Sequence, residues 1–186
     1  IGGGTMGGGI AMCFANAGIP VRLHDNDPEN LAKGIKVIEG NYARTVAKGR
    51  LSQEEMDKKM SLIVPTEAFD DLGDADVVIE AVYENLELKQ QIFEKLDTVM
   101  KEGALLATNT SGLDVDAIAA STSRPDDVCG MHFFSPANVM RLLEVVRGNE
   151  SSPKTLGTAM SLGKRLGKVS VMAGNCPGFI GNRMIG

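Results

Sequence analysis

The sequence contains no tryptophan, and aromatic residues make up only 4% of its 186 positions. Platforms of stacked aromatic rings for bases or sugars are therefore not expected. No apolar run approaches the roughly 18 residues that a membrane-spanning helix needs, so we predict no membrane segment. The first residues are glycines without a basic stretch, which is unlike a secretory signal peptide.

Positive charge and cysteine are also scarce. Lysine and arginine number 19 against 24 acidic residues, and the net charge of −5 argues against nucleic-acid binding. The cysteines Cys13, Cys129 and Cys176 are odd in number and too widely spaced for a disulfide framework or a zinc motif. We expect reduced thiols, no bound metal and a cytoplasmic location. The apolar (43%) and charged (23%) fractions are typical of a folded globular protein.

Both ends of the sequence are unusual for a complete domain. Ile1 leads directly into a glycine-rich run, so the sequence starts at the last residue of a predicted strand. It stops at Gly186, directly after an apolar-rich segment. We expect residues 1–186 to be one domain of a longer polypeptide, truncated at both ends.

Short apolar runs alternate with segments of helical periodicity along the chain. The predicted strands are residues 21–25, 62–64, 75–81, 104–108, 128–133, 142–146 and 168–172. The predicted helices are residues 7–17, 28–48, 52–60, 84–100, 115–120 and 154–166. This alternation predicts an α/β fold with a doubly wound, mostly parallel sheet covered by helices on both faces. The late strands fit less regularly, and we expect them to be irregular or antiparallel.

A glycine motif opens the chain. Residues 2–7, GGGTMG, fit the pattern G-x-G-x-x-G, and a predicted helix and then a strand ending in an acidic residue follow. In this context the first glycine allows a tight turn, the second a close approach of the pyrophosphate, and the third close packing of the helix. The free amides and positive end of the helix attract phosphates. The predicted contacts with a dinucleotide are Gly2, Gly4, Thr5, Met6 and Gly7.

The acidic residue at the end of the next strand is Asp25. Its carboxylate is placed to accept hydrogen bonds from the adenosine ribose and to repel a 2′-phosphate, which favours NAD over NADP. Arg22 could weaken this inference, but strand alternation points its side chain to the opposite face. His24 lies either near the adenosine or simply on the surface. The alternative for the whole motif is a glycine-rich loop followed by a solvated aspartate.

Two residues in the second half suggest acid–base chemistry. His132 lies near the end of an apolar run, and Glu144 lies inside the apolar strand predicted at 142–146. A carboxylate in so apolar a strand is costly unless it is paired. Beside an imidazole it would favour the protonated form and fix the tautomer, as a general base requires. The alternative is a purely structural ion pair.

Five segments together resemble 3-hydroxyacyl-CoA dehydrogenase: Gly2–Ala11, Glu80–Asn85, Thr108–Ser111, His132–Pro136 and Pro177–Arg183. The match covers essentially the whole chain, in the right order and spacing. The resemblance implies a Rossmann-like NAD-binding domain, which in the family precedes a helical dimerisation domain. The Ser-Pro-Ala stretch after the His-Phe-Phe motif and the run Gly174–Cys176 are most similar to the multifunctional fatty-acid oxidation enzymes, in which a hydratase region comes first.

The resemblance also implies roles for single residues. His132 and Glu144 match the catalytic pair of the family. Ser111 is implied to be a hydroxyl near the substrate oxygen and the nicotinamide, and Asn182 to bind substrate beside the imidazole. Without the resemblance, Ser111 would cap the next segment and Asn182 would face solvent. Lys48 matches the region of the family that meets the acyl-CoA, with a solvated lysine as the alternative.

Three further positions are implied to contact NAD. They are Glu84 and Lys89, for which a solvated helix start is the alternative, and Asn109 in the matched segment at 108–111. Ser135 departs from the family, because the shorter members usually carry asparagine after the His-Phe-Phe motif. Serine has a shorter hydrogen-bonding group, so we do not carry that cofactor contact over to this chain.

The expected function is NAD-dependent oxidation of (S)-3-hydroxyacyl-CoA to 3-oxoacyl-CoA in fatty-acid β-oxidation, by one domain of a multifunctional enzyme. The expected partners are an acyl-CoA, an attached hydratase region or a dimer partner, and neither nucleic acid nor membrane. One alternative is a Rossmann β-hydroxyacid dehydrogenase, which relies on an active-site lysine. A second is a scaffold that binds NAD without catalysis.

Overall fold

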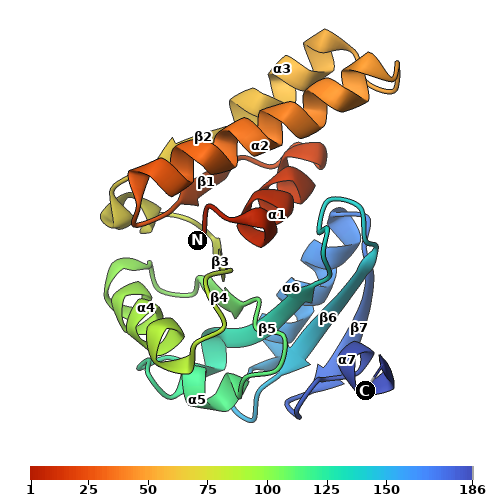
Figure 1. The fold of residues 1–186 in the computed structure, drawn as a ribbon. Coiled ribbons are helices and arrows are strands. Elements are labelled where there is room, and N and C mark those ends of the chain that lie inside the picture. The colour runs from red at the N-terminus through yellow and green to blue at the C-terminus, as the bar shows by residue number, and fades with distance from the viewer. Residues whose placement is uncertain (186) are drawn as a thin grey trace.

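The computed structural model describes residues 1–185, which form two sheets flanked by helices (Figure 1). The strands are β1 (Val21–His24), β2 (Ile63–Thr66), β3 (Val77–Glu80), β4 (Leu105–Thr108), β5 (Val128–Phe133), β6 (Leu142–Arg147) and β7 (Val169–Gly174). The α-helices are α1 (Thr5–Asn16), α2 (Pro28–Ala47), α3 (Gln53–Leu62), α4 (Leu86–Val99), α5 (Val115–Ala119), α6 (Pro153–Arg165) and α7 (Gly181–Ile185). Two 3-10 helices, η1 (Phe69–Leu72) and η2 (Pro125–Asp127), lie in connections.

The strands belong to a two-stranded sheet, β1-β2, and a five-stranded sheet in the order β3-β4-β5-β6-β7. All neighbours are parallel except β5 and β6, which are antiparallel and place His132 directly opposite Glu144. The predicted mostly parallel α/β fold is therefore confirmed. The irregular end of the sheet is a single antiparallel step, after which β7 is again parallel to β6.

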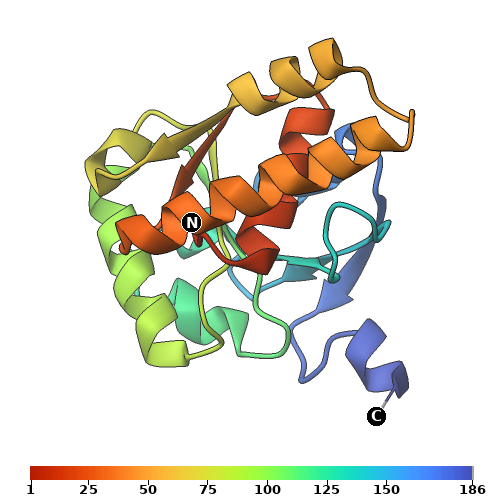
Figure 2. The same ribbon diagram turned by 45° about the horizontal axis from the view of Figure 1, so that its top comes forward.

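Alternating side chains on the strands divide the core between the two faces of the sheet. On β4, Leu105 and Ala107 pack towards α1 and α6, whereas Leu106 packs towards α4 and α5. A third apolar cluster joins α1, α2 and α3 to β1 and β2. Figures 1 and 2 show α2 and α3 side by side over this smaller sheet. The prediction of helices on both faces is confirmed.

Side-chain caps explain where most helices begin. Ser52 and Glu55 form a capping box at α3, with each side chain bound to the backbone of the other residue. Asp27, Asn85 and Asp114 cap α2, α4 and α5 by accepting from an amide of the first turn. Helix α1 is the exception, because its first turn follows Gly4 and has neither a side-chain cap nor an acidic residue.

Ile1 lies between the two sheets. Its amino group donates to the carbonyl of Ile79 at 2.7 Å, its carbonyl accepts from Ala81 at 2.8 Å, and Gly2 donates to His24 at 2.8 Å. These bonds join the end of β3, through Ile1, to the end of β1, through Gly2. Between the same two strands lies a cavity of about 610 Å³ with a largely apolar lining from β1, β3 and α1. We call this cavity the inter-sheet slot.

No helix within residues 1–185 combines the length and apolar character needed to cross a bilayer. Helix ends agree with the predictions to within two residues, and strand ends differ by up to two. Helix α1 begins at Thr5, two residues before the predicted start, because the glycine motif itself enters the first turn.

Candidate active site

The glycine motif forms a turn that presents the amino end of α1. Gly2 has φ +116°, a conformation that favours glycine, and a Cβ on Gly7 would lie 1.8 Å from the carbonyl oxygen of Gly2. The helix can therefore approach the turn only without a side chain at this position. A Cβ on Gly4 would meet no atom within 4 Å, so the backbone at the helix start faces open space. This arrangement fits the predicted phosphate site at Thr5 and Met6.

Asp25 is tied to this turn. Its carboxylate accepts from the amide of Gly3 at 2.8 Å and from the amide of Asp27 at 2.8 Å. His24 beside it is only 2% exposed, and its ring bonds to the carbonyl of Thr66 at 2.9 Å and to Asn26 at 3.2 Å. The surface alternative for His24 is therefore wrong, and the ring links the ends of β1 and β2.

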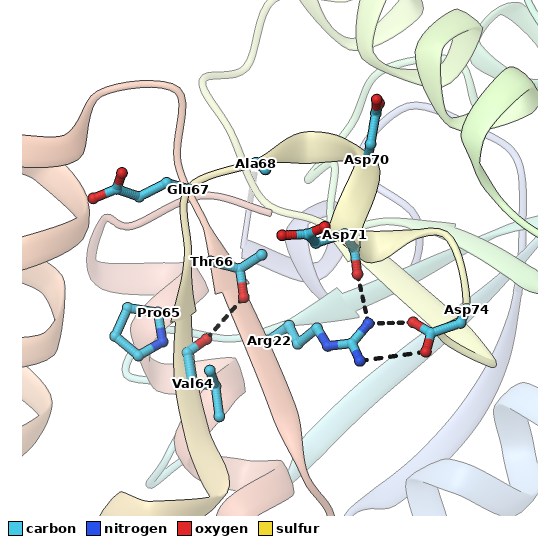
Figure 3. A pocket seen from close by; sticks show the side chains of 9 residues that line it. All are labelled: Arg22, Val64, Pro65, Thr66, Glu67, Ala68, Asp70, Asp71 and Asp74. Carbon is cyan, nitrogen blue, oxygen red and sulfur yellow. Dashed lines mark hydrogen bonds and ion pairs between the residues drawn. The ribbon is translucent and has the colours of Figure 1, made fainter.

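Arg22 points away from the glycine turn, as strand alternation predicts. Its guanidinium donates to the carboxylate of Asp74 and to the carbonyl of Asp71 (Figure 3). These partners hold the cation in a pocket that also contains Glu67 and Asp70. Asp25 therefore has no arginine from this position beside it, which keeps the site suited to a ribose with a free 2′-hydroxyl.

Glu84 connects the loop after β3 to the loop after β4. Its carboxylate accepts from the hydroxyl of Ser111 at 2.6 Å, from the amide of Ser111 at 2.7 Å and from the hydroxyl of Thr110 at 2.7 Å. Partial burial opposes the charge, but these bonds and the nearby Lys89 ammonium together hold the pKa of Glu84 below its ordinary value. The carboxylate is thus ionised at neutral pH and fixes the position of Ser111.

Lys89 is buried beneath this loop. The residue is 1% exposed, and its ammonium lies 2.5 Å from the carboxylate of Glu80 and 3.8 Å from that of Glu84. Glu80 is fully buried and also accepts from the amide of Val82 at 2.8 Å and the hydroxyl of Thr108 at 2.7 Å. The alternative of a solvated helix start is wrong for Lys89. Its predicted contact with NAD stays a prediction, since its ammonium is bound to Glu80.

His132 and Glu144 meet across the antiparallel step of the sheet. The ring nitrogen Nδ1 lies 3.2 Å from Oε1 of Glu144, and the two side chains are 6% and 0% exposed. Within residues 1–185, Nε2 of the imidazole has no hydrogen-bond partner and is not among the buried unpaired atoms. The carboxylate therefore fixes Nδ1, while Nε2 is free to exchange a proton with a bound molecule.

A turn before α7 completes the environment of Glu144. The amide of Ile180 donates to Oε2 at 2.8 Å, and the amide of Gly181 lies 3.4 Å from Oε1. The side chain of Asn182 donates to the carbonyl of Ser111 at 3.1 Å. The structure thus brings together the four residues predicted to be catalytic: His132, Glu144, Ser111 and Asn182.

Two other predicted residues occupy different positions. Asn109 accepts from the amide of Phe133 at 2.8 Å, which ties the end of β4 to the end of β5 beside the imidazole. Lys48 is exposed at the carboxyl end of α2. Helices α2 and α3 lie together, away from the five-stranded sheet (Figure 1). Among the described residues, 1–185, no contact links Lys48 to the catalytic group, so its predicted role stays a prediction.

The donors around the glycine turn fit a dinucleotide. The uncapped amides of α1 face open space, and Asp25 lies beside them. Within residues 1–185, no three histidine, cysteine or acidic side chains lie close enough to hold a metal ion. When bound, a dinucleotide would be held by the amides of Gly4, Thr5 and Met6 at its phosphates and by Asp25 at a ribose.

Sequence reasoning missed Glu80 and the amide contacts from Ile180 and Gly181. Glu80 could have been found, because it ends the apolar strand β3 just as Glu144 lies in an apolar strand. The amide contacts carry no such signal, because backbone donors are the same for every residue type.

Comparison with known proteins agrees with this geometry. The profile described as "3-hydroxyacyl-CoA dehydrogenase, NAD binding domain" matches residues 1–176. The chain belongs to this family. It is 51% identical to the peroxisomal bifunctional enzyme of Danio rerio over 185 residues, which cover 100% of this chain and 25% of the relative. The resemblance read from the sequence is confirmed.

Solved structures show the same fold. The (S)-3-hydroxybutyryl-CoA dehydrogenase PaaH1 from Ralstonia eutropha is 37% identical with a TM-score of 0.96, over 99% of this chain and 65% of that chain. FadB2 of M. tuberculosis is 34% identical with a TM-score of 0.97 and the same coverage, 99% and 65%. The chain spans about a quarter of the curated relatives that it matches, such as the 25% of the human peroxisomal bifunctional enzyme.

Proposed function

We propose that the protein oxidises (S)-3-hydroxyacyl-CoA to 3-oxoacyl-CoA with NAD. The observation that carries this proposal is the buried contact of 3.2 Å between His132 Nδ1 and Glu144 Oε1, which leaves Nε2 available. Oxidation of a secondary alcohol requires a base for the hydroxyl proton, and an imidazole backed by a carboxylate is such a base. The family of the chain and the names of its relatives support the choice of substrate.

In the proposed mechanism, Nε2 of His132 accepts the hydroxyl proton of the substrate as the carbonyl forms at C3. Bound NAD supplies the acceptor for the hydride that leaves the same carbon. Glu144 stabilises the imidazolium and keeps Nδ1 protonated, so the proton can return when the reaction runs in reduction. The hydroxyl of Ser111, held by Glu84, and the amide of Asn182 position the substrate oxygen and thioester.

The inter-sheet slot supports a longer polypeptide. Strands β1 and β3 each present an unpaired edge to it, and Gly2 already bonds to the end of β1 while Ile1 bonds to β3. We propose that an extended apolar segment continuous with Ile1 fills the slot and joins the two sheets into one. A quarter-length match to the bifunctional relatives is consistent with a domain that follows a hydratase region and precedes a helical, dimer-forming domain.

The thiols and the same relatives support a proposal for the compartment. Cys13, Cys129 and Cys176 are free, and burial raises the pKa of the Cys129 thiol to about 12, which makes it unreactive. We propose a reducing compartment, either the cytoplasm or a peroxisome. The relatives include peroxisomal enzymes and a bacterial fatty acid oxidation complex subunit.

His132→Gln in the complete protein tests the proposal. We expect kcat for a 3-hydroxyacyl-CoA to fall roughly 100- to 10,000-fold, the usual contribution of a general base, while the Kd for NADH stays nearly unchanged. Steady-state kinetics and NADH fluorescence measure the two quantities. Near-normal turnover would exclude His132 as the base.

The substrate class has its own test. Turnover of a 3-hydroxybutyryl-CoA ester is compared with that of free 3-hydroxybutyrate under the same conditions. Preference for the free acid would favour the β-hydroxyacid alternative, and NADH binding without turnover of either would favour the scaffold. The burial of Lys89 against Glu80 already speaks against an active-site lysine at that position.

A further inference from the structure

The turn of residues 176–182, which precedes and begins α7, touches the catalytic group from two sides. Through its backbone it donates to both oxygens of Glu144, from Ile180 at 2.8 Å and from Gly181 at 3.4 Å. Through Asn182 it binds the carbonyl of Ser111 at 3.1 Å. We call this segment the closing turn.

Glu144 depends on these amides because no lysine or arginine forms an ion pair with it within residues 1–185. Within residues 1–185 its one ion-pair partner is His132, whose charge changes with protonation. A fully buried carboxylate needs donors whether or not the imidazole is charged. The amides of Ile180 and Gly181 supply them and leave Oε1 facing Nδ1.

The closing turn is held in a conformation that its sequence does not favour. Phe179 has φ +50°, the one positive φ of a non-glycine residue between positions 1 and 185. Its ring is 2% exposed and packs edge-on against the His132 ring, with centroids 5.7 Å apart. Burial of this ring against the imidazole therefore stabilises a turn that would otherwise relax.

Gly181 is the point where the closing turn comes closest to the carboxylate. A Cβ there would lie 2.8 Å from the ring of Phe134 and 3.2 Å from Oε1 of Glu144. The Phe134 ring lies over the imidazole with centroids 4.4 Å apart. Any side chain at 181 would displace the ring, the carboxylate or both, so glycine is required by the approach itself.

We propose that the closing turn is a positioning element, with Gly181 as its positioning residue, that aligns Glu144 so that neutral His132 carries its proton on Nδ1. This proposal rests on the proposed function for its catalytic meaning, but the alignment is a property of the folded chain. A hydrogen bond from Nδ1 to a fixed acceptor selects this tautomer and leaves Nε2 as the basic nitrogen.

Nitrogen-15 NMR of the imidazoles at high pH tests the alignment without any substrate. The chain has two histidines, and a His132→Gln sample assigns their signals. We expect His132 to be almost entirely the Nδ1–H tautomer in the parent and a mixture in Gly181→Ala. Gly157→Ala in α6 is the matched control, because a Cβ there meets nothing within 4 Å. An unchanged tautomer in a folded Gly181→Ala overturns the proposal.

Amide hydrogen exchange keeps the proposal testable if Gly181→Ala does not fold. In Glu144→Ala, exchange at Ile180 and Gly181 should accelerate about tenfold or more, since each loses its acceptor. Exchange at the amides of the five-stranded sheet, which does not include Ile180 or Gly181, should stay nearly unchanged. Equal exchange rates at 180 and 181 in the two proteins would show that the carboxylate does not hold the turn.

A kinetic cycle in the complete protein tests the consequence for catalysis. Gly181→Ala should lower kcat with little change in KM for NAD, and it should cost little more once Glu144→Gln is present. Equal losses in both backgrounds would mean that the glycine acts independently of the carboxylate, which overturns the positioning role. A parent enzyme without acyl-CoA turnover would instead refute the proposed function, and the NMR result would still judge the alignment.

Discussion

Two carboxylates, Glu80 and Glu144, are both fully buried in the five-stranded sheet, but they are neutralised in different ways. Glu80 at the end of β3 lies 2.5 Å from the ammonium of Lys89, a permanent cation. Glu144 in β6 lies 3.2 Å from an imidazole and accepts two backbone amides. The first carboxylate is therefore paired with an ammonium, whereas the second is paired with a ring whose two nitrogens can each donate or accept a hydrogen bond.

The difference explains which group supports the fold and which is suited to chemistry. The Glu80–Lys89 pair links β3, β4 and α4 through Val82 and Thr108, so its charges hold the carboxyl ends of the strands together. In the proposed mechanism the proton moves at His132, and a fixed cation beside Glu144 would compete with His132 for the carboxylate. Backbone amides avoid this competition, because they stabilise the anion without adding a charge.

Breaking the Glu80–Lys89 pair should have the largest effect on stability. Lys89→Met leaves a buried carboxylate without its cation, and we expect the free energy of unfolding to fall by about 3–5 kcal/mol. Chemical denaturation of the isolated chain measures the loss. Lys95→Met on the same helix is the matched control, because that lysine is exposed and should cost at most about 0.5 kcal/mol.

A second substitution shows whether the loss comes from the unpaired charge. Adding Glu80→Gln to Lys89→Met removes the buried anion, so the double variant should recover part of the stability that the single variant lost. If the double variant is less stable than Lys89→Met, then the pair is not what stabilises this end of the sheet, and the comparison with Glu144 fails.

The sequence predicts the buried pairing of Glu144 better than that of Glu80. The role of Glu144 is predictable because a charge in the apolar run Leu142–Val146 needs a partner. Glu144 also follows His132 by 12 positions, a separation that fits two adjacent strands joined by a loop. The same reasoning applies to Glu80 after three apolar residues. The resemblance to the family, by contrast, involves Glu80 only as the first residue of the matched segment Glu80–Asn85.

Other features of the site have no signal in one sequence. The glycine turn was predictable because the motif and its spacing express a steric need, which the contact between Gly7 and Gly2 confirms. The bond between Glu84 and Ser111 joins residues 27 positions apart in two loops, and no periodicity relates loop residues to one another. The burial of Lys89 was equally hidden, since a lysine near a helix start is usually solvated.

Glu84 lies between the two extremes, since its side chain is 41% exposed and it is held mainly by neutral donors. Ser111→Ala removes the hydroxyl bond, and we expect a loss of about 1 kcal/mol at pH 7, discounted for exposure to solvent. Because the pKa of Glu84 is lowered in the folded state, its contribution is present above the ordinary carboxyl pKa and is lost as pH falls through the folded value. The difference between parent and variant should therefore shrink as the pH is lowered below that of the ordinary carboxyl group. Denaturation at pH 7 and pH 3 measures it, and a difference that persists undiminished at pH 3 would mean that the serine acts through packing and not through the charge of Glu84.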